Sequence, residues 1–220
     1  MGRFTRFGFE VASHTRLRKY LYYKYDYSFT PAQLCFLVGC LQRTASVRGP
    51  ILEVGCAYGH TTAFLNKHLE AVDDPRQYVC VDTFGGFTAS DTKAEATRGK
   101  SLDSFEGRYE DASLRFFERT MANSGVTRVR AVKADIVSWV PDISEKLSFC
   151  LIDVDLYQPV KAALKKLVPL MQPGGIIVVD DCKEHPLWDG ALQAYQEFVE
   201  GEGRLPLIFE GQLGLIEIAR

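Results

Sequence analysis

The sequence of 220 residues has no apolar run that approaches membrane-spanning length, which is about 20 residues. Its basic N-terminus is not followed by the apolar stretch of a secretory signal peptide. Arg6 breaks the myristoylation pattern that Met1-Gly2 begins. We therefore expect a cytoplasmic protein with no membrane partner.

Cysteine pairs of the C-x-x-C type are also absent, although the chain has 6 cysteines. Cys80 and Cys150 lie inside apolar runs. This placement indicates small buried hydrophobic side chains in a reducing compartment rather than a disulfide framework or a zinc site.

A strong excess of either charge is missing, since the formal net charge is −2. This near-neutral balance argues against a nucleic-acid-binding protein. The first 30 residues carry six basic and two acidic side chains, about +4 in all, and alternate them with aromatic residues. We expect this segment to dock on the core or on a second subunit of a homodimer, or to close over the substrate as a lid.

Strand-like apolar segments alternate with helical patterns from residue 31 onward. Thr30-Pro31 predicts the start of a helix over 31–45. Strands are predicted over 50–55, 77–82, 126–135, 146–155 and 174–181, and helices over 60–72, about 104–123, 158–171 and 190–200. This alternation predicts a parallel sheet with helices on both faces.

The last two strand-like segments, 205–210 and 213–219, are too close for a helical crossover and predict an antiparallel hairpin. The expected fold is therefore an α/β doubly wound sheet of seven mostly parallel strands with an antiparallel last strand and an N-terminal helical and aromatic extension. The length suits one domain, with residues 1–48 as the arm and first helix and 49–220 as the core. Ligands of such sheets bind at the carboxyl ends of the strands.

The first predicted strand leads through Glu53, Gly55 and Gly59 into a helix. Glycines at such a turn allow a ligand to approach the backbone closely. The G-x-G-x-x-G fingerprint of dinucleotide-binding proteins is not met. The pattern E-x-G-x-x-x-G instead resembles motif I of S-adenosylmethionine (SAM)-dependent methyltransferases, with Ala57 where that family usually has glycine.

Acidic residues end the next two strands. Asp82 can accept hydrogen bonds from ribose hydroxyls. Asp135, alone, fits a helix N-cap equally well. In class I methyltransferases, which Asp135-Ile136 resembles here, the acid binds the adenine amino group and the next residue packs on the ring.

Two further pairs of acids end the fourth and fifth strands: Asp153 with Asp155, and Asp180 with Asp181. Neighbouring strands bring these four carboxyl groups to one rim, where they cannot all stay ionised and unpaired. Either some of them protonate or a cation lies among them. Oxygen ligands of this kind suit Mg²⁺ best, with Ca²⁺ or Mn²⁺ as alternatives.

The stretches "LIDVDLY", "QPGG", "IIVVDDC" and "WDGALQAYQEF" resemble the metal-dependent macrocin O-methyltransferase-like family over residues 50–200. The resemblance implies that Asp153, Asp180 and Asp181 hold the metal. It also implies a SAM site formed by Glu53, Gly55, Cys56, Ala57, Tyr58, Gly59, Thr61, Asp82, Thr83, Asp135, Ile136 and Asp153.

The implied reaction transfers the methyl group of SAM to a hydroxyl of a small molecule, such as a natural-product sugar or a catechol-like diol. Asp155 is the first candidate for the general base, and His185 is the alternative. Three other classes remain open: a metal-independent methyltransferase, an NAD-type oxidoreductase and a non-catalytic SAM-binding protein.

Overall fold

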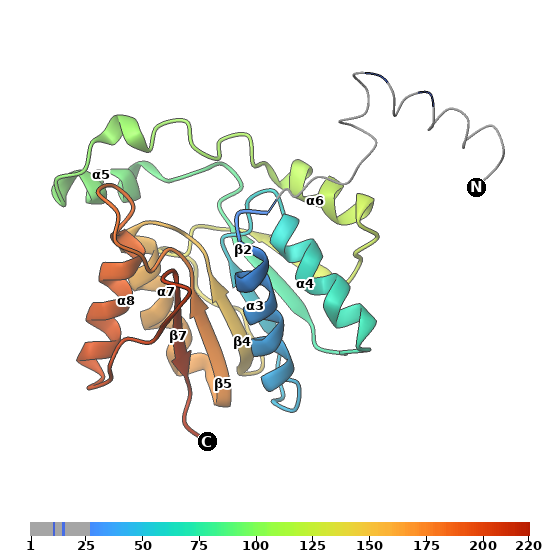
Figure 1. The fold of residues 1–220 in the computed structure, drawn as a ribbon. Coiled ribbons are helices and arrows are strands. Elements are labelled where there is room, and N and C mark those ends of the chain that lie inside the picture. The colour runs from blue at the N-terminus through green and yellow to red at the C-terminus, as the bar shows by residue number, and fades with distance from the viewer. Residues whose placement is uncertain (1–10, 12–14, 16–26) are drawn as a thin grey trace.

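The computed structural model describes residues 11, 15 and 27–220 (Figure 1). Most of the predicted N-terminal arm lies outside these residues. Its roles as a lid or a dimer contact stay predictions, as do the cytoplasmic location and the division at residue 48.

Seven strands form one sheet in the order β3-β2-β1-β4-β5-β7-β6 within the described part of the chain. The strands are β1 (Ile51–Val54), β2 (Tyr78–Asp82), β3 (Val129–Lys133), β4 (Leu147–Ile152), β5 (Met171–Val179), β6 (Ile208–Phe209) and β7 (Leu213–Glu217). The first five strands pair in parallel. β7 is antiparallel to β5 and to β6, which confirms the predicted fold.

Helices cover both faces of the sheet (Figure 1). The α-helices are α3 (Pro31–Arg43), α4 (His60–Ala71), α5 (Ala89–Thr97), α6 (Leu114–Asn123), α7 (Tyr157–Leu167) and α8 (Gly190–Gly201). Short 3-10 turns, η1 (Leu102–Ser104) and η2 (Val168–Leu170), complete the described elements.

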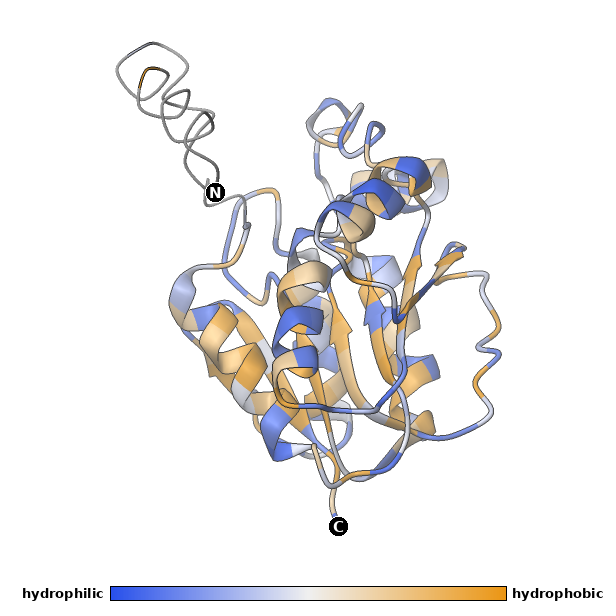
Figure 2. Cartoon of the chain, turned by 90° about the vertical axis from the view of Figure 1, so that its right-hand side faces the viewer, coloured by the Kyte–Doolittle hydropathy of each residue, from blue (hydrophilic) through white to orange (hydrophobic). Residues whose placement is uncertain are grey.

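Two apolar cores lie on either side of the sheet. One joins the sheet to α3, α4 and α6, and the other joins it to α7 and α8. The central strands β1 and β4 are buried along their whole length, as parallel strands covered on both faces must be. Figure 2 shows the same arrangement, with hydrophobic strands in the interior of the molecule.

The helix α3 begins where the sequence predicts it. The Thr30 hydroxyl accepts the Gln33 N–H at 3.3 Å, and the Gln33 side chain accepts the Thr30 N–H at 2.8 Å. This reciprocal capping box satisfies two N–H groups that a helix start otherwise leaves unpaired.

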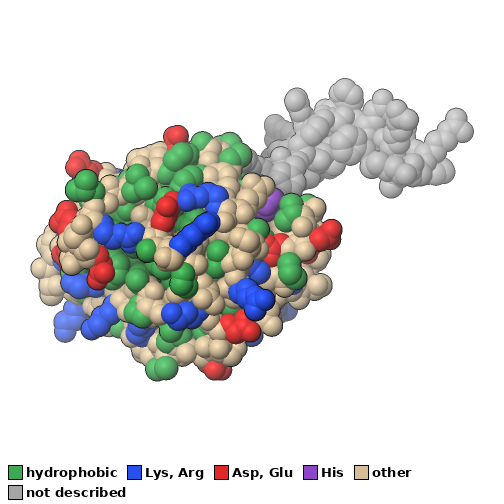
Figure 3. Space-filling model, turned by 90° about the horizontal axis from the view of Figure 1, so that it is seen from below, with side chains coloured by type: hydrophobic (Ala, Val, Ile, Leu, Met, Phe, Trp, Pro, Cys, Tyr) green, Lys and Arg blue, Asp and Glu red, His purple; other side chains and the backbone are tan. Residues whose placement is uncertain are grey.

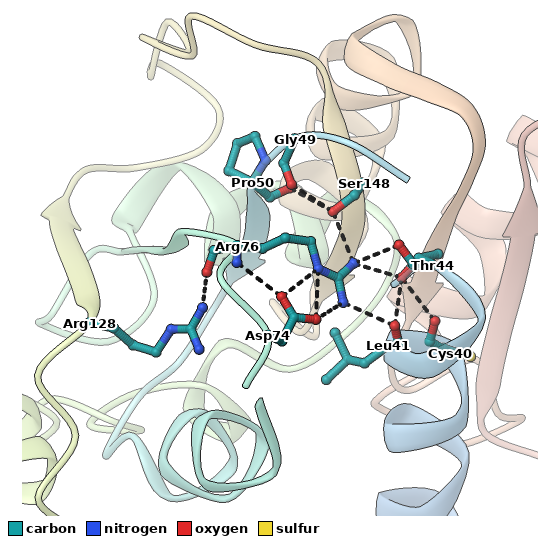
Figure 4. A network of polar contacts seen from close by, with 9 residues as sticks. All are labelled: Cys40, Leu41, Thr44, Gly49, Pro50, Asp74, Arg76, Arg128 and Ser148. Atoms are coloured by element: carbon teal, nitrogen blue, oxygen red, sulfur yellow. Dashed lines mark hydrogen bonds and ion pairs between the residues drawn. The ribbon is translucent and has the colours of Figure 1, made fainter. Parts of the chain in front are cut away.

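A buried arginine ties the far end of α3 to the sheet (Figure 4). Arg76 pairs with Asp74 at 2.6 Å, and both side chains are only 7% exposed. The same guanidinium donates to the carbonyls of Leu41 and Thr44, at 3.0 and 2.9 Å, and to the Ser148 hydroxyl at 3.2 Å. It therefore joins the last carbonyls of α3, the loop before β2 and the start of β4.

Three local predictions differ from the structure. The helix expected over 104–123 begins only at Leu114, because the Ser113 hydroxyl caps it through the Phe116 N–H. The stretch between the strand predicted over 77–82 and the helix predicted over 104–123, for which no element was predicted, contains α5. β5 begins at Met171 and not at residue 174, so Pro173 is part of the strand, beside an irregularity in its pairing with β4.

Three predictions from composition concern the cysteines, membrane-spanning segments and surface charge. All six cysteines are free, and all except Cys35 are buried. Within residues 27–220 no helix is long and apolar enough to cross a membrane. On the lower face, Lys and Arg side chains are interspersed with Asp and Glu (Figure 3). This view of one face does not test nucleic-acid binding, so the expected absence of nucleic-acid partners stays a prediction.

Candidate active site

One cavity of about 370 Å³ lies at the carboxyl ends of β1, β2, β4 and β5. The segment between β2 and α6 passes over this edge of the sheet (Figure 1). The wall contains all the predicted cofactor and metal residues: Glu53, Gly55, Cys56, Ala57, Tyr58, Gly59, Thr61, Asp82, Thr83, Asp135, Ile136, Asp153, Asp180 and Asp181, together with Asp155.

The loop after β1 passes close to the backbone of Asp153. Gly55 has a φ of 83°, and a Cβ there would lie 1.7 Å from the Asp153 carbonyl oxygen. Gly59 has a φ of 81° and precedes α4, where a Cβ would meet Phe117 and Met121 at 2.8 Å. Both positions therefore require glycine for space as well as for conformation.

Glu53 is fully buried beneath this loop. Its Oε2 accepts hydrogen bonds from the hydroxyls of Thr62 and Tyr78, at 2.7 and 2.8 Å. Burial raises the pKa of Glu53 to about 7, although these hydrogen bonds oppose the shift. The bonds direct the carboxyl group toward α4 and β2, so it joins this helix to the sheet.

Asp82 connects the loops after β1 and β2. Its Oδ2 accepts the N–H groups of Cys56 and Ala57, at 2.8 and 2.9 Å, and its Oδ1 accepts that of Phe84 at 2.7 Å. A carboxylate has about four acceptor sites. The Thr83 hydroxyl lies 3.5 Å from Oδ1, and a ribose hydroxyl would replace this long contact. Asp82 thus organises the loops that the sequence predicts to bind the cofactor.

Asp135 caps a turn, which is close to the N-cap role that its position in the sequence also allows. Its Oδ1 accepts the Val137 N–H at 2.8 Å, and its Oδ2 is 3.4 Å from the Ser138 hydroxyl. Asp135 also lines the cavity, and Ile136 beside it is buried. The cap and the predicted contact with adenine are compatible, because the carboxylate keeps free acceptor positions.

The four acids gather at the ends of β4 and β5 as predicted. Burial and the neighbouring carboxylates raise the pKa of Asp153 well above its usual range. Burial and a hydrogen bond to Asp181 do the same for the pKa of Asp155. Burial, followed by the charge of Asp181, raises the pKa of Asp180 to about 7.

The backbone at these acids is not extended, although the fourth strand was predicted to continue to residue 155. β4 ends at Ile152, and Asp155 and Asp181 each have a φ of 56°. Asp155 faces Asp181 because its backbone turns out of the strand direction. Left-handed conformations of non-glycine residues cluster at functional sites.

Lys183 and Gln212 already bind two of the acids. Lys183 Nζ lies 2.7 Å from Asp181 Oδ1 and donates to Gln212 Oε1 at 3.2 Å. Gln212 Nε2 donates to Asp180 Oδ1 at 2.9 Å. Within the described ranges, no group of three His, Cys, Asp or Glu side chains is arranged to hold a metal ion.

His185 does not reach the acid cluster, which corrects its proposed role as an alternative base. It lies in a separate surface depression with Glu184, Pro186 and Asp189. Its Nδ1 accepts the N–H groups of Leu187 and Trp188, both at 3.1 Å. The imidazole therefore caps a turn, and Asp155 remains the candidate base.

The polar helix α5 closes one side of the site. Glu95 is buried, pairs with Arg98 and accepts the Tyr157 N–H at 2.7 Å, which caps the start of α7. Arg98 and Lys100 also pair with Asp189, at 3.0 and 2.8 Å, at the start of α8. These contacts fix α5 to the helices beside Asp155.

Sequence reasoning missed several wall residues, including Phe87, Asp91, Tyr109, Lys183 and Gln212. The Asp155 charge raises the pKa of Tyr109, so this phenol faces the acids. Phe87 contacts Tyr109 edge-on, with ring centroids 5.6 Å apart. Lys183 was detectable as a cation two residues after Asp181, whereas the others carry no local signal.

The chain matches a family model described as a methyltransferase domain over residues 52–182. The O-methyltransferase NovP aligns with a TM-score of 0.68 and 20% identity over 86% of this chain and 80% of its own. The calicheamicin methyltransferase CalS11 aligns with a TM-score of 0.66 and 21% identity over 84% of this chain and 78% of its own. An O-methyltransferase from Bacillus cereus in complex with SAH aligns with a TM-score of 0.52 and 21% identity over 87% of this chain and 82% of its own. At these identities the structures show a shared fold, and no curated protein matches the chain.

Proposed function

Since the chain belongs to the methyltransferase-domain family and is a SAM-dependent methyltransferase, we propose that it methylates a hydroxyl oxygen of a small molecule. One observation carries this proposal: the acids after β4 and β5 share a cavity with the predicted cofactor loop. A methyl donor and a group that activates an oxygen acceptor would therefore meet in one space.

The cofactor would lie over the loop Gly55–Gly59. Asp82 would accept a ribose hydroxyl, and Asp135 with Ile136 would bind the adenine. SAM supplies the activated methyl group, and the protein positions it. The close backbone contact of Gly55 with Asp153 would place the methyl donor beside the acids.

The acceptor hydroxyl would lie between the sulfonium and the carboxyl group of Asp155. As the oxygen attacks, a C–O bond forms and the C–S bond breaks, so S-adenosylhomocysteine leaves. Asp155 would take the hydroxyl proton in its ionised state. Its raised pKa makes it a stronger base than an exposed carboxylate.

The donor chemistry of the acids fits a hard divalent cation such as Mg²⁺. Asp153, Asp180 and Asp181 would hold it, after Asp181 separates from Lys183 and Asp180 from Gln212. The cation would lower the pKa of the acceptor hydroxyl. Metal-independent methylation is the second candidate, favoured by the Lys183–Asp181 ion pair, which already places one positive charge among the acids.

A natural-product sugar or a catechol-like diol would suit this site. Phe87 and Tyr109 offer aromatic faces beside the acids, on which a sugar or an aromatic ring can pack. The structurally similar CalS11 is a TDP-rhamnose 3'-O-methyltransferase, which supports the sugar alternative.

Thermal unfolding of the full chain tests the proposal. We expect S-adenosylhomocysteine to raise the melting temperature and Mg²⁺ to raise it further, because each ligand stabilises the state that binds it. No response to S-adenosylhomocysteine would contradict the proposed cofactor site. A response to it without any Mg²⁺ effect would support metal-independent methylation.

Asp180→Asn tests the acids by another measurement. We expect methyl transfer to a diol acceptor to fall by about 100-fold or more, while SAM affinity measured by calorimetry changes little. Full activity of the unaltered chain in excess EDTA would contradict a role for the metal. Unchanged activity of the variant would contradict a role for Asp180 in the reaction.

A further inference from the structure

Asp91 is a buried acid, and the contacts within the fold explain only one of its two carboxyl oxygens. It lies in the first turn of α5, is 4% exposed, and forms part of the cavity wall. Its Oδ2 accepts the Thr88 hydroxyl at 2.6 Å, and its N–H donates to the same hydroxyl at 3.2 Å. Capping of α5 thus explains one oxygen of the carboxyl group.

The other oxygen, Oδ1, is buried and has no hydrogen-bond partner among residues 27–220. Two more buried side-chain atoms of the described chain share this property, Asn66 Oδ1 and His68 Nε2, but neither residue lines the cavity. A buried acceptor without a donor is costly, and an unpaired one in a native structure calls for an explanation. A ligand in the cavity would supply the missing donor.

The position of Asp91 indicates which donor it would meet. Burial raises the pKa of Asp91, and the charge of the nearby Asp135 adds to the rise. Both residues line the cavity. Asp135 is the residue expected to accept from the adenine amino group. That amino group carries two N–H bonds, and one acid accounts for only one of them.

We propose that Asp91 Oδ1 accepts the second N–H of the adenine amino group, so that Asp91 and Asp135 together select adenine in the cofactor. The inference rests on the cofactor part of the proposed function and is independent of the acceptor and the metal. A hypoxanthine ring in place of adenine would present a carbonyl oxygen to both carboxyl groups, which would repel it.

Calorimetric titration of the full chain with S-adenosylhomocysteine and with S-inosylhomocysteine tests this proposal. We expect the unaltered chain to bind the adenine compound at least about tenfold more tightly. Asp91→Ala should weaken adenine binding by about tenfold and narrow the preference for adenine over hypoxanthine. Asp103→Ala removes an exposed acid of the same segment and should leave both affinities unchanged.

An unchanged preference in Asp91→Ala would overturn the proposal, as would unchanged affinity for S-adenosylhomocysteine. If that variant does not fold, Asp91→Asn preserves the shape of the side chain and should narrow the preference in the same direction. An unaltered chain that binds neither compound would contradict the proposed function itself, which separates the two failures.

Discussion

Ala57 has a left-handed backbone conformation, with a φ of 40°, in the middle of the loop between Gly55 and Gly59. A Cβ in this conformation crowds the backbone and costs about 1 kcal/mol or more, which glycine avoids. We expect Ala57→Gly to raise the free energy of unfolding by about 1 kcal/mol, measured by urea denaturation.

The control for this substitution is Ala63→Gly, within α4, where the backbone is helical. There the same change should lower stability by about 1 kcal/mol or more, because glycine is a poor helix former. Equal effects at both positions would show that the conformation of Ala57 is not strained.

Lys183 provides the second test at the scale of a residue. Its ammonium group lies 2.7 Å from Asp181, where it would repel an incoming divalent cation. We expect Lys183→Met to bind Mg²⁺ at least about tenfold more tightly than the unaltered chain, by calorimetry without substrate. Lys67→Met removes an exposed lysine of α4 that pairs with Glu70, and should leave Mg²⁺ affinity unchanged. Equal affinity in all three proteins would rule out competition.

At the scale of elements, Arg76 forms the polar contacts that join the C-terminal end of α3 to the sheet. Arg76→Met would leave Asp74 buried without its partner and would free the carbonyls of Leu41 and Thr44. We expect a loss of about 3–5 kcal/mol in the free energy of unfolding, measured by denaturant titration. Arg43→Met removes an exposed partner of Glu217 and should cost less than about 1 kcal/mol. Similar losses in both variants would contradict the assigned role of burial.

The elements that were predicted correctly have an apolar pattern or a capping residue. The buried strands and the Thr30-Pro31 helix start are of this kind. The helix α5 was missed because it buries Asp91 and Glu95 instead of an apolar stripe. Its position depends on ion pairs to residues about 90 positions away, which no local pattern reveals.

The site was predictable where residues follow strands, because topology alone brings strand ends to one edge. His185 was a wrong candidate because its ring nitrogen caps the turn that follows it, and this turn holds the side chain away from the acid cluster. Tyr109 and Asp91 reach the cavity from the segment that passes over the edge of the sheet. Their distance from any strand end concealed them.

At the scale of the whole molecule, buried acids make stability depend on pH. The folded chain holds Glu53 with a pKa of about 7, against an ordinary value of 4.5. Its contribution to stability is therefore full below pH 4.5, falls as pH rises from 4.5 to 7, and then levels off. Asp180 shifts in the same direction and adds to the loss.

We expect Glu53→Gln to flatten this dependence, by an amount of the order of 3 kcal/mol between pH 4.5 and pH 7. Urea denaturation at several pH values measures it. Glu106→Gln, at an exposed position, should follow the pH profile of the unaltered chain. A Glu53→Gln profile parallel to that of the unaltered chain would contradict a raised pKa.

The contact of Gly55 with the Asp153 carbonyl has a consequence for redesign. A side chain at Gly55 has no space, so the donor half of the site and the acid cluster behave as one block with a fixed internal spacing. Changes of acceptor preference must therefore come from wall residues outside this block and outside the proposed cofactor contacts, such as Phe87 and Tyr109. A library confined to these two positions would vary what is methylated and leave the geometry of methyl delivery as a constant.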